Sequence, residues 1–328
     1  MNKHIRTMRL GMIAAALAAT LPIPTLAQQS APWPSRVITI VSPYNPGGTN
    51  DIPARILAEG FQRIFGQSVI VKNVPGAGGL IGSQEVLKAA PDGYTLLLSN
   101  IAGMIVQPVV KTPAPYDPLK DFTPIAKVSD AYAFVGTSAD LPVKNVGELI
   151  AHAKKEPGKL NYSTAGSGSF GNFIGEYFKL LTGTDIVHIP AKGSAAALLE
   201  MKAGRIQLMF DPLVLPQSSD GRIKVLAVVN KTRLPHAPQI PTVREAGGPE
   251  MDMPAWYGLF GPAQMPRDIV AKLEAAINTV LSDPETRQKL LTAGLTANVE
   301  TGSQFRSKLE SELKLYREVK EKAKMTVE

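Results

Sequence analysis

Apolar positions between residues 36 and 98 alternate between two periods. Short runs rich in Val, Ile and Leu are separated by longer segments in which apolar residues recur every three to four positions. The short runs are typical of buried strands, and the longer segments are typical of helices that pack on a sheet. They predict strands at 36–41, 68–72 and 94–98 and helices at 49–65 and 81–90. This order predicts a βαβαβ unit whose parallel sheet is covered on both faces.

A second unit of the same kind is predicted after residue 140. Its strands are expected at 160–164, 186–189, 206–210 and 224–229, and its helices at 141–155, 170–181 and 195–203. The C-terminal part is expected to be helical and to end in a charged helix at 303–324, with a buried stripe of Phe305, Leu309, Leu313 and Tyr316. Ligands of open α/β sheets lie at the carboxyl ends of strands, so two such units facing each other would form a cleft.

The N-terminus has the pattern of an export signal. Three basic residues precede the apolar run 10–19, two prolines break that run, and small residues follow at Thr25 and Ala27. A membrane-spanning helix needs about 20 unbroken apolar residues, which makes an uncleaved anchor the less favoured alternative. We therefore expect cleavage after Ala27 and export to the periplasm.

Composition narrows the function classes. The formal net charge of +7 falls to +4 without residues 1–27, because that segment holds three Lys or Arg and no acidic residue. This mild charge, with no long basic run, does not favour nucleic-acid binding. The chain contains no Cys, which excludes disulfides, thiol catalysis and Cys-ligated zinc.

A glycine-containing turn follows the first predicted strand. Its candidate ligand-binding residues are Tyr44, Pro46, Gly47, Gly48, Thr49 and Asn50. Glycines let the backbone approach a ligand closely, and the free N–H groups at the start of the next helix attract an anion. Thr49 or Asn50 could cap this helix, and Asp51 would complement its dipole in the first turn. The alternative is an ordinary strand-to-helix turn.

A second glycine-containing turn follows the strand at 160–164. Its candidate residues are Ala165, Gly166, Ser167, Gly168 and Ser169. The spacing matches G-x-G-x-x-G, but a dinucleotide site also needs an acidic residue at the end of the next strand, where this chain has 189–192, Ile-Pro-Ala-Lys. We therefore expect a seat for a small anion at this turn and no nucleotide cofactor.

Two further strand ends offer polar groups to the same cleft. Ser99 and Asn100 follow the strand at 94–98, and Asp211 ends the strand at 206–210. Asp211 could meet a polar or cationic part of a ligand, or it could simply cap the turn that follows.

Catalysis is not expected. Neither Ser167 nor Ser169 fits G-x-S-x-G, and His152, His188 and His236 have no evident partner in the sequence. No H-E-x-x-H or clustered His and Asp pattern predicts a metal. A secreted serine esterase that uses the Gly-Ser turn is the alternative enzymatic hypothesis.

The chain resembles the TctC/Bug family of periplasmic substrate-binding proteins of tripartite tricarboxylate transporters. The resemblance runs from about Trp33 to the last helix and rests on the order and spacing of eight short segments. The segments are WPSRVITIV at 33–41, PGGTND at 46–51, NVPGAGG at 73–79, AAPDGYTL at 89–96, AGSGS at 165–169, MFD at 209–211, IPTV at 240–243 and WYGL at 256–259.

This resemblance implies an α/β, two-lobed periplasmic binding-protein fold of type II, a Venus flytrap with a cleft between its lobes. The lobes would be 31–130 plus 252–328, and 131–251. The ligand would be a carboxylate held by backbone amides and ordered waters of the loops 44–50 and 165–169. It would pass to a separate membrane permease. Presentation of the ligand to a membrane sensor, alongside uptake, is a separate hypothesis that the sequence leaves open. The resemblance implies no cofactor, and we expect a monomer.

The sequence departs from the family pattern at three places. Ser99-Asn100 replaces a usual Gly-Thr pair, Asn172 replaces a common His, and Ala191 replaces a usual Tyr. Asn172 and Ala191 therefore join the candidate ligand-binding residues. Their smaller side chains suggest a mono- or dicarboxylate bulkier than aspartate.

Overall fold

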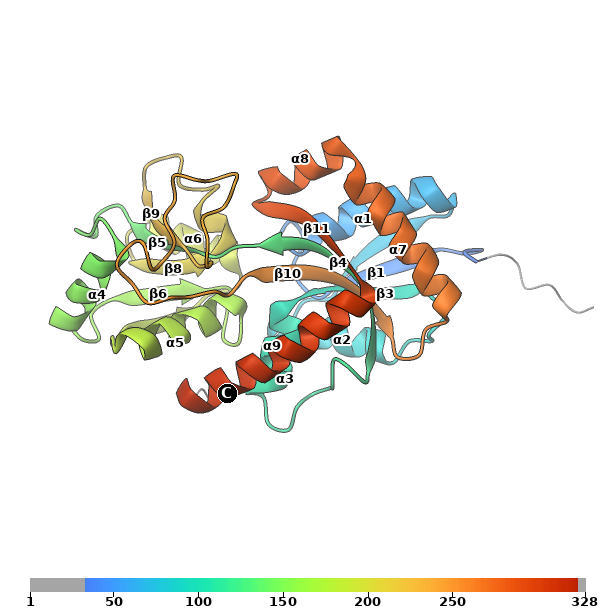
Figure 1. The fold of residues 1–328 in the computed structure, drawn as a ribbon, viewed down its shortest axis with the longest axis horizontal. Coiled ribbons are helices and arrows are strands. Elements are labelled where there is room, and N and C mark those ends of the chain that lie inside the picture. The colour runs from blue at the N-terminus through green and yellow to red at the C-terminus, as the bar shows by residue number, and fades with distance from the viewer. Residues whose placement is uncertain (1–32, 324–328) are drawn as a thin grey trace, which may run out of the picture. The chain divides into compact units, whose positions relative to one another are not determined.

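The computed structural model describes residues 33–323, and its fold is drawn in Figure 1. The predicted export signal, residues 1–27, lies outside the described residues. Within the described range, no helix combines the length and apolar character that crossing a membrane would require.

The first sheet combines strands from both ends of the chain. Its strand order is β11-β4-β10-β3-β1-β2. The strands are β1 (Ile38–Ser42), β2 (Val69–Asn73), β3 (Thr95–Asn100), β4 (Phe122–Ala131), β10 (Ala255–Pro262) and β11 (Leu295–Thr301). The helices that pack with it include α1 (Asp51–Phe65), α2 (Leu80–Leu87), α7 (Arg267–Ser282), α8 (Pro284–Thr292) and α9 (Gly302–Ala323).

The second sheet uses the middle of the chain. Its strand order is β7-β6-β8-β5-β9. The strands are β5 (Phe134–Ser138), β6 (Asn161–Thr164), β7 (Val187–Pro190), β8 (Leu208–Asp211) and β9 (Ile223–Val228). Its helices are α4 (Val146–Lys155), α5 (Phe170–Thr182) and α6 (Ser194–Lys202).

The predicted parallel arrangement is confirmed for the predicted strands, and each antiparallel pair includes a strand that the sequence did not predict: β5, β10 or β11. The predicted parallel pairs are present: β1 pairs with β2 and β3, and β6 pairs with β7 and β8. However, β10 runs antiparallel to both β3 and β4, and β5 runs antiparallel to β8 and β9. The chain crosses between the sheets through β4 and β5 and returns into β10, and a strand that returns in this way enters against its neighbours.

The helix predicted at 141–155 begins five residues later than expected. Asn145 is its N-cap residue, and its side chain accepts a hydrogen bond from the N–H of Glu148 at 2.8 Å. The Glu148 carboxylate accepts in return from the N–H of Lys144 at 2.8 Å. This pair differs from a standard capping box in that Glu148 reaches the N–H one residue before the N-cap, and it places the first turn of α4 at Val146.

The last helix packs as predicted. Phe305, Leu309, Leu313 and Tyr316 are buried and form the inner stripe of α9. Tyr316 stacks on Phe173 of α5, with ring centroids 4.4 Å apart. In Figure 1, α9 (red) crosses below the strands of the first sheet and extends toward α5. The C-terminal helix therefore contacts elements of both sheets.

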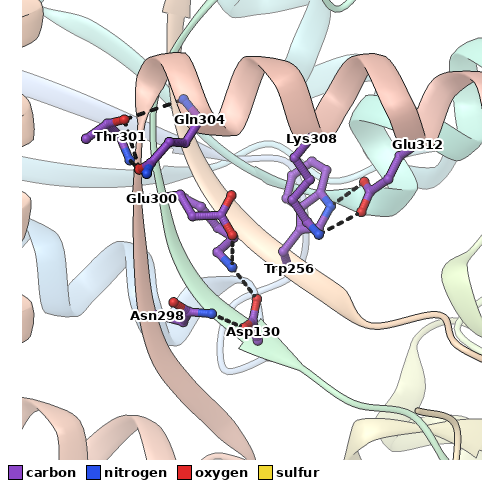
Figure 2. Close-up of polar contacts among 9 residues, drawn as sticks. Asp130, Trp256, Asn298, Glu300, Thr301, Gln304, Lys308 and Glu312 are labelled. Atoms are coloured by element: carbon purple, nitrogen blue, oxygen red, sulfur yellow. Dashed lines mark hydrogen bonds and ion pairs between the residues drawn. The ribbon is translucent and has the colours of Figure 1, made fainter. Parts of the chain in front are cut away.

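A buried charge cluster lies on β4 where the chain leaves the first sheet. The Lys127 side chain is 2% exposed, and its Nζ lies 2.8 Å from Asp130 Oδ1 and 2.5 Å from Glu300 Oε1 on β11. Asn298 donates to the second Asp130 oxygen at 2.5 Å. Figure 2 shows these contacts beside α9, where Lys308 and Trp256 contact Glu312. The cluster ties β4 to β11 just before the crossing to β5.

Candidate functional site

The turn between β1 and α1 is braced by Asp51. Its carboxylate is 1% exposed and accepts three hydrogen bonds: from the Gly47 N–H at 2.9 Å, from Arg55 Nε at 2.6 Å and from Asn73 Nδ2 at 2.8 Å. Burial alone would raise the pKa of Asp51, but these hydrogen bonds and the Arg55 charge hold that pKa below its usual range. Asp51 is therefore ionised at neutral pH and lies in the first turn of α1, as predicted.

The expected side-chain cap of α1 is wrong. Asn50 is the N-cap residue, but its side chain makes no capping bond. Its Nδ2 instead donates to Ser42 Oγ and to the Leu98 carbonyl, both at 3.0 Å. Thr49 Oγ1 accepts from the hydroxyl of Tyr257 at 2.7 Å. Both side chains are thus held by neighbouring strands, and the first N–H groups of the helix are left without a side-chain acceptor.

Backbone N–H groups are available at this helix start. The Gly48 carbonyl accepts from the N–H groups of Asp51 and Ile52. Within residues 33–323, we find no acceptor for the N–H groups of Thr49 and Asn50. Gly47 has a φ of 77°, which glycine adopts without strain. Pro46 and Gly47 are exposed, while Gly48 and Thr49 are half-buried. The turn can therefore present N–H groups to an anion.

Tyr44 joins this turn to the end of β3. Its hydroxyl lies 2.9 Å from Asn100 Oδ1 and 3.1 Å from the Gly78 carbonyl. Burial raises the pKa of Tyr44, so the hydroxyl stays protonated as a donor. Ser99 is fully buried, and its Oγ has no hydrogen-bond partner in the described part of the chain; neither has Asn50 Oδ1. The fold thus gathers Tyr44, Asn50, Ser99 and Asn100 near the carboxyl ends of β1 and β3.

The turn between β6 and α5 is held by hydrogen bonds to the side chains of Thr164, Ser169 and Asn172. Thr164 Oγ1 accepts from the Gly166 N–H at 3.2 Å, and Asn172 Oδ1 accepts from the Gly168 N–H at 3.0 Å. Ser169 is the N-cap of α5, and its side chain accepts from the N–H of Asn172 at 3.3 Å. These contacts use the N–H groups of both glycines for the turn itself. The expectation that the Gly-Ser turn offers its amides to an anion therefore applies to fewer groups than its sequence suggests.

Four further candidate residues lie in or beside the Gly-Ser turn: Ala165, Ser167, Ala191 and Asn172. Ala165 and Ser167 are exposed. Ala191 follows β7 and donates its N–H to the Thr164 carbonyl at 3.1 Å, which brings it beside the turn. Asn172 is 7% exposed, with its amide facing Gly168 and Tyr162. The fold thus brings Ala191 and Asn172 next to the Gly-Ser turn.

Asp211 makes the capping contact that was its alternative role. Its side chain accepts from the Leu213 N–H at 2.9 Å and from the Ser194 hydroxyl at 2.6 Å. It is 7% exposed, and burial raises its pKa although both hydrogen bonds oppose that shift. Asp211 thus links β8 to the start of α6.

One side chain from the first half of the chain holds the second turn, and the sequence pattern did not indicate it. Gln107 is 1% exposed, and its Nε2 donates to the Gly168 carbonyl at 3.2 Å. It follows a π-helical turn, Ala102–Val106, and begins the short helix α3 (Gln107–Val110). Gln107 stands inside an apolar stretch, and nothing in the local sequence indicates which distant group its side chain contacts.

His188 lies in a strand that was predicted, but its contacts could not be foreseen. It lies on β7, stacks on Tyr162 and contacts Thr164 and Asn172, the two residues that hold the Gly-Ser turn. Among residues 33–323, no group of three or more His, Cys, Asp or Glu is arranged to hold a metal ion.

Comparison with known proteins assigns the family. The family model described as "Tripartite tricarboxylate transporter family receptor", TctC, matches residues 53–322. The chain belongs to this family. It is also similar to the periplasmic binding protein BugD, at 30% sequence identity and a TM-score of 0.81, covering 90% of this chain and 99% of that one. The TctC family is a family of periplasmic binding proteins, and the predicted two-lobed α/β fold is confirmed by this likeness.

Two further solved TctC-type structures contain carboxylates. An R. palustris protein with adipate matches at 31% identity and a TM-score of 0.84, covering 90% of this chain and 99% of that one. MatC from Rhodopseudomonas palustris, with bound malate, matches at 29% identity and a TM-score of 0.81, covering 87% of this chain and 99% of that one. This chain is thus a solute-binding protein of a family whose members bind carboxylates.

Proposed function

We propose that this protein captures a small mono- or dicarboxylate in the periplasm and delivers it to a membrane permease of the tripartite tricarboxylate type. The observation that carries the proposal is the start of α1, where the turn braced by Asp51 offers backbone N–H groups and no side-chain cap. Backbone N–H groups at a helix start bind a carboxylate without a basic side chain. The adipate and malate of the related structures are of the same chemical class.

The proposed ligand contacts come from two regions of the chain. The first is the turn of Tyr44, Pro46, Gly47, Gly48, Thr49 and Asn50, with Ser99 and Asn100 at the end of β3. The second is the turn 165–169 with Ala191 and Asp211. Asn172 would act indirectly, by holding the shape of this turn through its hydrogen bond with the Gly168 N–H. The proposed lobes are 31–130 plus 252–328, and 131–251, and the ligand would lie between them.

A thermal-shift screen tests the ligand class. The protein is unfolded and refolded to remove trapped ligand, then heated with adipate, malate, tricarboxylates, and the matched amides. We expect a raised Tm with at least one acid and none with its amide, because the amide lacks the charge that the N–H groups recognise. A ligand at 100 times its Kd adds about 2.7 kcal/mol to the free energy of unfolding. Equal shifts with an acid and its amide would contradict the carboxylate seat.

We further propose that the Gly-Ser turn is not catalytic. Among residues 33–323, no histidine hydrogen bonds to Ser167 or Ser169, and Ser169 Oγ is engaged by the N–H of Asn172. A fluorogenic ester series should therefore be hydrolysed no faster by this protein than by its Ser167→Ala and Ser169→Ala variants. Hydrolysis that disappears in either variant would favour the esterase instead.

A further inference from the structure

His188 lies under the Gly-Ser turn and contacts both residues that hold it. The imidazole stacks on Tyr162, with ring centroids 4.8 Å apart. Its Nε2 lies 2.8 Å from Thr164 Oγ1, and its Nδ1 lies 3.3 Å from Asn172 Nδ2. Thr164 holds the start of the turn through Gly166, and Asn172 holds its far side through Gly168. The ring thus bridges the two supports of the turn.

The contacts assign one tautomer to this ring. Asn172 Oδ1 accepts from the Gly168 N–H, which places the Nδ2 amino group toward Tyr162 and His188. An amide –NH₂ can only donate, so His188 Nδ1 must accept and carry no proton. The proton of the neutral ring is therefore on Nε2, which donates to Thr164 Oγ1. The Thr164 hydroxyl in turn donates to the Gly166 carbonyl at 3.0 Å.

A second proton on His188 would disrupt this arrangement. Protonated Nδ1–H would face the Asn172 amino group, donor against donor. Rotating the Asn172 amide to relieve that conflict would turn its amino group toward the Gly168 N–H and create the same conflict there. Either outcome releases the far side of the turn, because Asn172 is the residue that binds the Gly168 N–H.

The surroundings of His188 favour its neutral form. The titratable groups that face it are Tyr162 on β6, and Glu176 and Lys179 on α5. Burial lowers the pKa of His188, Glu176 opposes that shift, and Lys179 adds to it. Glu176 is itself engaged by Lys179 at 3.0 Å and by the Tyr162 hydroxyl at 2.6 Å. The ring is therefore neutral at pH 7 and becomes charged only below its usual range, about pH 6.5.

We propose that His188 is a positioning residue for the ligand site: its neutral imidazole orders the 165–169 turn through Thr164 and Asn172, and protonation weakens carboxylate binding. The inference rests on the proposed function, since it assumes that this turn contacts the ligand. The protein would then bind its carboxylate tightly at a pH above the midpoint of His188 protonation and weakly at a pH below it.

The first test needs no ligand. Uniformly ¹⁵N-labelled protein is titrated from about pH 7.5 to about pH 5.0, the range in which histidine changes charge, and the Gly166 and Gly168 amide signals are followed. We expect both signals to move with one midpoint, equal to that of the His188 ring. In His188→Gln, whose side chain cannot titrate, both signals should stay still. His152→Gln, a histidine change on α4, should leave the wild-type titration unchanged. Glycine signals that titrate equally in His188→Gln would overturn the inference.

The second test measures malate and adipate binding across the same range. Each pH unit below the transition should weaken wild-type affinity by up to about tenfold, whereas His188→Gln should show only the change that ligand protonation causes. Parallel pH profiles in the two proteins would overturn the link to binding. If neither acid binds at any pH while the glycine signals follow His188, the proposed ligand class fails and the His188 mechanism stands.

A second variant, Asn172→Asp, keeps the inference testable if His188→Gln does not fold, because protonation of His188 should support the turn in this variant. In Asn172→Asp the side chain would accept from both the Gly168 N–H and a protonated Nδ1. Protonation of His188 would then support the turn, and the His188 midpoint should rise relative to wild type. A midpoint that stays in place or falls would contradict the assigned contact between Asn172 and Nδ1.

Discussion

Replacing Lys127 with methionine is expected to lower the free energy of unfolding by about 3–5 kcal/mol, the usual cost of removing one partner from a buried ion pair. Methionine fills a similar volume but cannot pair with Asp130 or Glu300. Asp130 is itself 7% exposed, so its carboxylate would lose its counter-charge where water can hardly replace it. The loss of stability should be greatest at β4 and β11, the strands that this cluster joins (Figure 2).

Urea unfolding followed by circular dichroism measures this change. The control is Lys289→Met, the same substitution in a pair with Glu285 whose two side chains are 51% and 75% exposed. Exposed pairs contribute about 0–1 kcal/mol, so the control should change the unfolding midpoint little. Similar losses in the two variants would show that the Lys127 cluster does not behave as a buried pair.

Asp51→Ala is expected to weaken carboxylate binding about tenfold, or about 1.4 kcal/mol, and to lower the free energy of unfolding by about 2 kcal/mol, as loss of hydrogen bonds to a buried charge does. The change frees the Gly47 N–H, Arg55 and Asn73 from their common acceptor. The turn that presents the N–H groups of Thr49 and Asn50 then loses its brace. Calorimetric titration with the acid that raises the Tm measures the affinity.

The sign of this effect separates bracing from simple electrostatics. Removing a negative charge near an anion site should strengthen anion binding if the long-range field dominates. Glu59→Ala removes the same charge from an exposed position on the same helix, and should leave affinity unchanged or slightly higher. An Asp51→Ala variant that binds its acid more tightly than wild type would contradict the bracing role.

The pH dependence of stability at Asp51 follows from its lowered pKa. A carboxylate whose pKa is lower in the folded than in the unfolded chain stabilises the fold above the unfolded value, about 3.9 for Asp. That contribution is lost as the pH falls through the lower, folded value. Asp51 should therefore stabilise the turn fully at the pH of the binding tests. Acid unfolding of the wild-type protein should begin above the folded pKa of Asp51, because other groups take up protons at higher pH.

Elements with a strong local pattern were predictable. The strands β1, β2, β3 and β6 and the helices α1, α5 and α9 lie within a few residues of their predicted positions, because each carries its own apolar run or stripe. β4 was not predicted, because Lys127 and Asp130 interrupt its apolar pattern and read as solvent-exposed. Burial of those two charges is possible only because Glu300 and Asn298, about 170 residues later, complete the pairing.

The two glycine turns could be located in the sequence because glycine, Ser, Thr and Asn between a strand and a helix indicate a particular backbone geometry. Their partners could not. Thr49 is bound by Tyr257, 208 residues away, and the Gly168 carbonyl by Gln107, 61 residues away. A local pattern reports backbone preference and burial, whereas a hydrogen bond depends on where the fold brings two distant side chains. The chemistry of each turn is therefore local, and the orientation of its N–H groups is decided by tertiary contacts.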